Sequence, residues 1–158
     1  MALLLVALLG VCTGLRTLTP IAVLSWFAYL HALHLVGWHA FAASLVSVIL
    51  FTAMALGEYI GDKLPTTPSR TSAVGLIGRS CFGALAGLLL AQPLALNMTT
   101  SLLIGVLGAL IGAYAGWFVR TRSVVALRSA DWPVAVIEDV IAIGASITLL
   151  NAVVAHAV

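Results

Sequence analysis

Four of the five acidic residues in this chain lie in or at the edges of apolar segments. Glu58 and Asp62 are four positions apart near the end of one segment, and Glu138 and Asp139 are adjacent near the start of another. A charge placed in hydrocarbon costs roughly 2.5 to 3.5 kcal/mol even on the more lenient insertion scale. Carboxylates in these positions therefore indicate a functional site, of the kind that binds a proton or a cation.

Helix geometry limits which carboxylates can act together. Residues four apart share one face of a helix, so Glu58 and Asp62 point in the same direction. Adjacent residues diverge by about 100°, so at most one of Glu138 and Asp139 faces the same cavity as its counterpart. We expect Glu58 and Glu138 to be the main ion-binding carboxylates, with Asp62 and Asp139 secondary.

Two arginines also lie in apolar surroundings and offer partners for these carboxylates. Arg16 follows a short apolar run, and Arg79 lies early in a longer one. They are counter-ions to the carboxylates or anchors for an anionic substrate or lipid headgroup. Alternatively, they neutralise Glu58 and Glu138 as buried pairs that only fix helix packing.

The composition is that of an integral membrane protein. Hydrophobic residues make up 63% of the 158 residues, charged residues 8%, and the mean hydropathy is +1.20. In soluble domains about a quarter of all residues are charged. We therefore predict one transmembrane domain over residues 1–158, surrounded by membrane lipids. The small positive net charge is explained by membrane topology, so nucleic acid is not an expected partner.

The apolar runs predict an all-α, polytopic bundle of five to six spans. A helix needs about 20 apolar residues to cross a bilayer. The four runs from residue 40 onward reach that length, whereas the first two are separated by Gly14-Leu-Arg-Thr-Leu-Thr-Pro20, where glycine and proline disfavour a continuous helix. Residues 2–36 are then one short and one full span, or a discontinuous or re-entrant pair. The runs cover residues 2–14, 17–36, 40–61, 73–92, 99–119 and 133–157.

The distribution of cations predicts the orientation of the bundle. One loop carries Lys63 and Arg70 and another carries Arg120, Arg122 and Arg128, whereas the loops near residues 37–39 and 93–98 contain no Lys or Arg. By the positive-inside rule the first two loops are cytoplasmic, and the C-terminus is external.

A weak internal duplication is compatible with an inverted repeat of residues 1–63 and 73–158. An arginine early in an apolar run precedes an acidic helix twice, as Arg16 with Glu58 and as Arg79 with Glu138. Many transporters build a central site between inverted halves. Only two residue types are matched, so chance pairing is the alternative.

Signatures of soluble enzymes and cofactor sites are absent from the sequence. The chain contains no Gly-x-Ser-x-Gly elbow, no His-Glu-x-x-His and no glycine-rich phosphate loop after a strand. His31, His34 and His39 have no carboxylate or thiolate nearby in sequence and are expected at the membrane interface. We predict no enzyme activity and no cofactor, and the sequence leaves metal binding undetermined.

Four stretches in order resemble an uncharacterised family of small bacterial integral membrane proteins, domain of unknown function 4126. They are Gly14-Leu-Arg-Thr-Leu-Thr-Pro20, Glu58-Tyr-Ile-Gly-Asp-Lys-Leu-Pro65, Arg79 ahead of Gly83-Ala-Leu-Ala-Gly87, and Glu138-Asp139. The resemblance implies a multi-span helical protein of a bacterial inner membrane and no settled activity. The chain departs from the family where it has Asp131-Trp-Pro133 in place of an Asn-Pro step.

A fainter similarity links residues 58–63 to cation exchangers whose membrane motif reads Glu, apolar, Gly, Asp, Lys. This chain has one extra residue in the motif and lacks a second copy.

These observations lead to one main functional hypothesis. The chain is expected to be a small transporter or channel-like protein with an intramembrane site for an ion, a proton or a small polar or anionic substrate. The alternatives are a structural or accessory membrane subunit, and a lipid flippase or lipid-headgroup-modifying protein. A homo-oligomer is compatible with each. The predicted site residues are Arg16, Glu58, Asp62, Arg79, Glu138 and Asp139.

Overall fold

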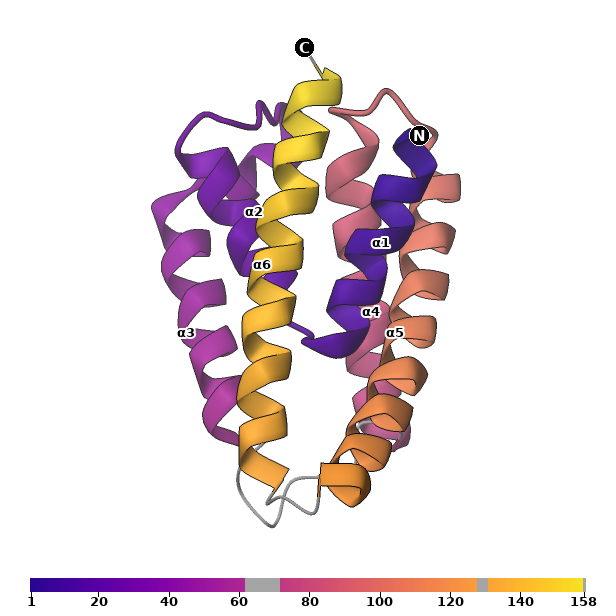
Figure 1. Cartoon of the computed structure of the whole chain (residues 1–158). Helices are drawn as coiled ribbons and strands as arrows, with labels where there is room; N and C mark the ends of the chain where they lie inside the picture. Colours follow the sequence, from indigo (N-terminus) through magenta and orange to yellow (C-terminus); the bar gives the residue numbers. More distant parts are fainter. Residues whose placement is uncertain (62–71, 128–130, 158) are drawn as a thin grey trace.

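A computed structural model describes residues 1–61, 72–127 and 131–157 as an all-helical bundle (Figure 1). These residues form six α-helices and one 3-10 helix. The elements are α1 (Ala2–Leu15), α2 (Thr19–Tyr29), the 3-10 helix η1 (Gly37–Ala43), α3 (Leu45–Gly61), α4 (Ala73–Ala91), α5 (Met98–Leu127) and α6 (Asp131–Ala157).

Several helices begin at residues whose side chains cap the first turn. The Ser72 hydroxyl accepts a hydrogen bond from the Gly75 amide at the start of α4. The Ser44 hydroxyl accepts a hydrogen bond from the Ser47 amide at the start of α3. At the start of α5, Oδ1 of Asn97 accepts hydrogen bonds from the amides of Thr99 and Thr100. These caps satisfy amides that have no partner within the helix. Pro20 lies in the first turn of α2, where its missing N–H costs nothing.

The helices α1 and α2 form a hairpin that turns back inside the bundle. The first runs inward from the end where the N-terminus lies, and the second returns to that end (Figure 1). They contain 14 and 11 residues, which at 1.5 Å per residue gives lengths of about 21 and 17 Å. The hydrocarbon core is about 30 Å thick, so neither helix is long enough to cross it. The chain breaks between Leu15 and Thr19, within the predicted interval Gly14 to Pro20.

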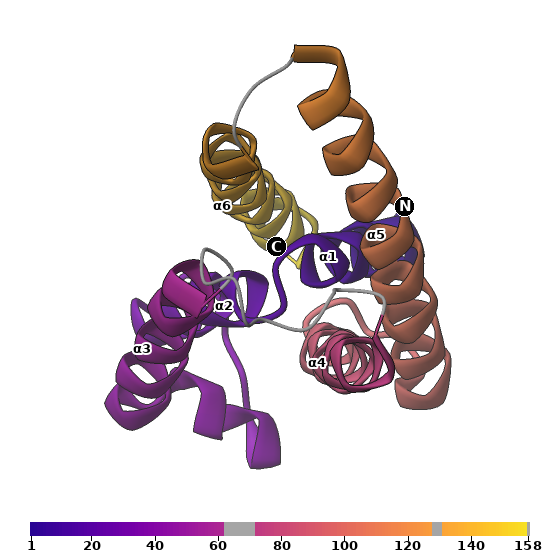
Figure 2. The ribbon, with the colours of Figure 1, turned by 90° about the horizontal axis from the view of Figure 1, so that it is seen from below.

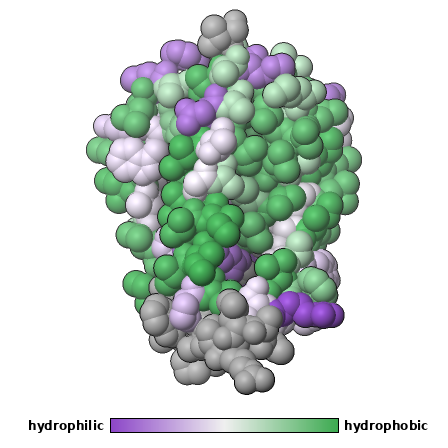
Figure 3. All heavy atoms as spheres, viewed as in Figure 1, coloured by the Kyte–Doolittle hydropathy of each residue, from purple (hydrophilic) through white to green (hydrophobic). Residues whose placement is uncertain are grey.

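Three described helices are long and apolar enough to cross a membrane, namely α4, α5 and α6. A fourth span is present if η1 and α3, which are bent by 59° relative to each other, count as one. The expected five to six spans are therefore not confirmed. Apolar side chains cover much of the middle of the face seen in Figure 3, and hydrophilic residues gather toward its ends. This distribution is that of a membrane protein.

The described helices give no support to the predicted repeat. The first half contains two short helices and the bent pair of η1 and α3, whereas the second half contains three long helices. The two halves therefore differ in helix length and in the position of their breaks.

Glycines bring α1, α4 and α5 into close contact. A Cβ atom added at Gly112 of α5 would collide with the carbonyl oxygen of Val11 in α1, and one at Gly87 of α4 would collide with that of Ser101 in α5. A Cβ atom at Gly108 would collide with the carbonyl oxygen of Ala7 in α1, and one at Gly83 with that of Gly105 in α5. Small residues allow this approach in membranes, where helix association depends on van der Waals packing.

The bundle consists of two groups of helices connected by the hairpin. The first helix packs against α4 and α5, whereas α2 packs against α3 and η1. The last helix, α6, contacts both α1 and α2 (Figure 2). The turn between α1 and α2 therefore lies where the two groups meet.

We predict that Gly112→Ala lowers the free energy of unfolding by roughly 1 to 3 kcal/mol, because the added methyl group forces α1 and α5 apart. Gly57→Ala is the matched control, since a Cβ atom there meets nothing within 4 Å. In a helix this control should be neutral or stabilising by up to about 1 kcal/mol. Thermal unfolding in detergent micelles measures both effects, and equal midpoints for the two variants would contradict the packing described.

We also predict that both ends of the chain lie outside the cytoplasm, because both termini lie at the end of the bundle opposite the C-terminal end of α5, which carries Arg120 and Arg122 (Figure 1). A phosphatase reporter that is active only outside the cytoplasm should be active when fused after Val158 and inactive when fused after Leu127. The reverse pattern would show that the bundle is inserted the other way around.

Candidate functional site

The hairpin turn exposes two backbone amides in the interior of the bundle, and a carboxylate from another helix binds both. Thr17 donates its amide hydrogen to Oε1 of Glu58 at 2.8 Å, and Leu18 donates to Oε2 at 2.9 Å. These amides precede the first turn of α2 and have no helical partner. Glu58 lies in α3 and is half-buried. Its negative charge also lies at the positive end of the α2 dipole.

Arg16 is completely buried and pairs with Asp139 of α6. The guanidinium Nη2 lies 2.5 Å from Oδ1 of Asp139, and the two side chains are 0% and 11% exposed. The guanidinium also lies 5.6 Å from the centroid of the Tyr59 ring, within the range of a cation–π contact. Arg16 has extended backbone angles, φ −135° and ψ 112°, so the helix ends at this residue and directs its side chain away from α1.

Two further contacts connect the turn to α3 and α4. The Arg79 guanidinium, which is nine-tenths or more buried, donates from Nη1 to the Thr17 hydroxyl at 2.9 Å. The hydroxyls of Thr19 and Tyr59 share a hydrogen bond of 2.6 Å.

These residues form one group, which we call the tip cluster. Arg16, Glu58, Arg79 and Asp139 supply its charges, and Thr17, Thr19 and Tyr59 supply hydroxyls. The members come from the hairpin and from α3, α4 and α6. Two guanidinium groups and two carboxylates balance in formal charge, as a low-dielectric interior requires.

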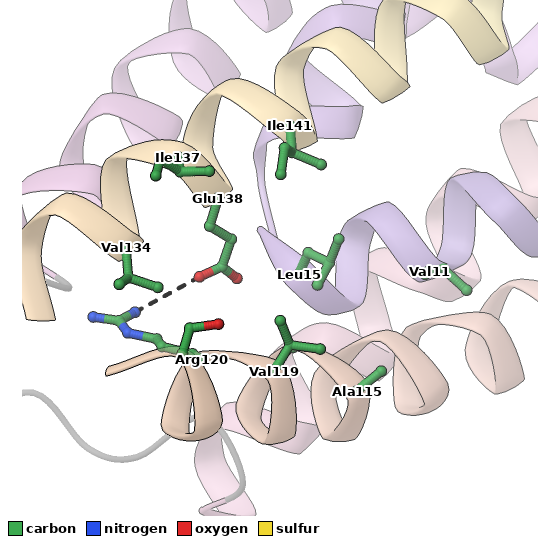
Figure 4. Close-up of a pocket in the computed structure, with 11 residues that line it drawn as sticks. Val11, Leu15, Ala115, Val119, Arg120, Val134, Ile137, Glu138 and Ile141 are labelled. Atoms are coloured by element: carbon green, nitrogen blue, oxygen red, sulfur yellow. Dashed lines mark ion pairs between the residues drawn. The ribbon is translucent and has the colours of Figure 1, made fainter. Parts of the chain in front are cut away.

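Glu138 points to a different part of the molecule from its neighbour Asp139. It faces Arg120 of α5, with Oε2 and the guanidinium Nη1 3.8 Å apart (Figure 4). Both side chains lie at a cavity of about 350 Å³ between α1, α5 and α6. The two neighbouring acids therefore diverge, as helix geometry predicted.

The structure brings together four of the six predicted site residues. Glu58, Arg16, Arg79 and Asp139 meet at the tip cluster, whereas Glu138 lies at the separate cavity. Asp139, expected to be secondary to Glu138, is the acid that faces Arg16. Asp62 lies outside the described residues, as do Lys63, Arg70 and Arg128.

Sequence reasoning missed Tyr59, Thr17 and Thr19 as members of the site. Their position was a usable signal, because Thr17 lies within the helix break, Thr19 begins the next helix and Tyr59 follows Glu58 directly. The sequence also assigned Arg120 to orientation, whereas the structure places its guanidinium opposite Glu138. Nothing in the sequence spacing indicated that pair.

Metal binding was left undetermined by the sequence. Among the described residues, no group of three or more His, Cys, Asp or Glu side chains is arranged to hold a metal ion. His31 and His34 are exposed, and His39 is buried with Nδ1 3.2 Å from the Val36 carbonyl oxygen.

No protein-family model, curated protein or solved structure matches this chain. The functional argument therefore depends on the geometry of the site.

We predict that Asp139→Asn destabilises the protein far more than Glu138→Gln, although the two residues are neighbours. Removing one partner from a buried ion pair in close contact costs about 3 to 5 kcal/mol. Glu138 and Arg120 are 3.8 Å apart, against 2.5 Å for Asp139 and Arg16, and Arg120 is 15% exposed whereas Arg16 is 0% exposed, so less is lost with Glu138. Thermal unfolding of the two variants in the same detergent gives the comparison. Equal shifts in the unfolding midpoint would show that the Arg16 and Asp139 pair does not stabilise the fold.

Proposed function

We propose that this chain is a small membrane transporter or channel-like protein whose site is the tip cluster. The observation that carries the proposal is the meeting of charged side chains from α3, α4 and α6 at a helix break inside an apolar bundle. Broken helices at membrane depth are tolerated where they are buried in protein or line a cavity, and transporters use them to bind ions.

The chemistry of the cluster favours an exchangeable anionic group at the turn. Two amides at the N-terminal end of α2 bind the Glu58 carboxylate, and the Arg79 guanidinium binds the Thr17 hydroxyl beside them. Such a position attracts negative charge. When Glu58 binds a proton, it loses the charge that holds it there, and an anion or small anionic substrate can take its place. Proton binding and substrate binding are then linked at one residue.

The proposal also implies an arrangement of the helices in the membrane. We infer that α3 with η1, α4, α5 and α6 are complete crossings and that the α1–α2 hairpin re-enters from the external side. The cationic segments at residues 62–71 and 120–130 are then cytoplasmic. The chain would lie in a bacterial inner membrane, in keeping with its resemblance to the uncharacterised bacterial family.

Flux measurements in liposomes test the transport proposal. Purified protein should carry proton, sodium or chloride flux above that of empty liposomes. Glu58→Gln should reduce this flux at least about tenfold, since the amide cannot cycle between charged and neutral forms. Ile60→Ala is the matched control, because Ile60 lies in the same helix and is 67% exposed. Flux that persists in both Glu58→Gln and Asp139→Asn would contradict the proposal.

A structural or accessory subunit is the second candidate, and the pairing within the cluster favours it. Glu58 binds two amides and Arg16 binds Asp139, so the charges also hold the helices in register. Under this alternative, Glu58→Gln lowers the unfolding midpoint but no flux is lost, because none is present. Measuring flux and stability on the same preparations separates the two candidates.

A further inference from the structure

The cavity beside Glu138 is an apolar groove between α1, α5 and α6, separate from the tip cluster. Its volume is about 350 Å³, and its walls are aliphatic apart from Arg120, Ser123 and Glu138. In Figure 4, Leu15 and Val11 extend from α1 toward the side chains of the other two helices. Aliphatic residues from all three helices line it, among them Val11, Leu15, Val119, Val134, Ile137 and Ile141.

The groove is open toward the bilayer. Three of its lining residues are more than half exposed, namely Val119 at 59%, Ile137 at 57% and Ile141 at 55%. They lie on helices long and apolar enough to cross a membrane, so lipid is the medium that they face. A volume of this size would hold on the order of ten water molecules at about 30 Å³ each. Water is stable only where several polar partners are available, and the aliphatic walls do not supply them.

The charged end of the groove lies at the depth of the lipid headgroups. Arg120 is 22 residues beyond Met98, the first residue of α5, and at 1.5 Å per residue this corresponds to about 33 Å. That distance is close to the thickness of the hydrocarbon core, about 30 Å. If Met98 marks one interface, Arg120 therefore marks the other. Leu15 and Val11 line the part of the groove that continues toward the membrane interior (Figure 4).

The headgroup end of the groove carries one positively charged side chain, Arg120, and one negatively charged side chain, Glu138. Arg120 and Glu138 face each other there at 3.8 Å. A phosphate alone would meet the Glu138 carboxylate with a like charge. A headgroup that carries both a phosphate and an ammonium complements both residues.

We propose that the groove binds one molecule of an amino-phospholipid, phosphatidylethanolamine in chemical class. One acyl chain lies between α1, α5 and α6, the phosphate binds Arg120, and the ammonium binds Glu138. This binding is independent of the transport proposal, because none of these side chains belongs to the tip cluster. The lipid would also fill the space between α5 and α6 at the cytoplasmic end of the bundle.

Native mass spectrometry tests the groove. Protein in micelles that contain equal amounts of phosphatidylethanolamine and phosphatidylglycerol should retain one phosphatidylethanolamine. Ile141→Trp, which fills the groove, should reduce the retained fraction at least about tenfold. Val140→Trp is the matched control, because Val140 is 64% exposed on the same helix and does not line the groove. Equal retention by the two variants overturns the proposal.

A second variant tests the headgroup. Glu138→Gln should abolish the preference for phosphatidylethanolamine over phosphatidylglycerol, while Arg120 continues to hold the phosphate and one lipid is still retained. A wild-type protein that binds both lipids equally, or a preference that survives Glu138→Gln, overturns the assignment of the ammonium. The unfolding midpoint of each variant, measured alongside, shows that it is folded when its lipid is counted.

Discussion

A chain that turns back inside an apolar bundle must satisfy the backbone amides at its turn without water, and the rest of this structure follows from that constraint. Each unsatisfied backbone group in hydrocarbon costs several kcal/mol. Glu58 binds the amides of Thr17 and Leu18 with both carboxylate oxygens. Bringing this carboxylate to the turn introduces a charge, and the buried guanidinium groups and Asp139 keep the whole group neutral. Stability and any ion binding at the turn therefore depend on the same atoms.

Packing by small residues is what allows such a group to be assembled from separate helices. Glycines on α1 and α5 bring these two helices to backbone contact, and glycines on α4 and α5 do the same for that pair, so that the end of α1 is held at a fixed position. The hairpin then connects the group of α1, α4 and α5 with the group of α2, α3 and η1, and α6 contacts both. The polar residues lie where these groups meet. Close packing fixes the position of the end of α1, and the charged pairs fix how the two groups of helices are aligned with each other.

Local features could be predicted from the sequence, whereas the choice of partners could not. The break between Gly14 and Pro20 and the divergence of Glu138 from Asp139 depend on nearby residues, and the structure contains both. The end of α2 at Tyr29 was missed, because the chain remains apolar to Val36 although His31 adopts a positive φ of 59°. Which of two adjacent acids meets Arg16 depends on how α6 is rotated about its axis. That rotation is set by contacts with α1 and α2, which no spacing in the sequence records.

The hairpin has a consequence for the order in which the protein is made. Its two helices are synthesised first, yet the carboxylate that binds the turn lies about 40 positions later, the arginine that binds Thr17 lies 62 positions later, and Asp139 is carried by the last helix. Ribosomal synthesis delivers the N-terminal segment before its partners exist. The amides and charges of the turn therefore lack these partners until α3, α4 and α6 have been made. The contacts of the part of the chain that is made first can be completed only after the last helix.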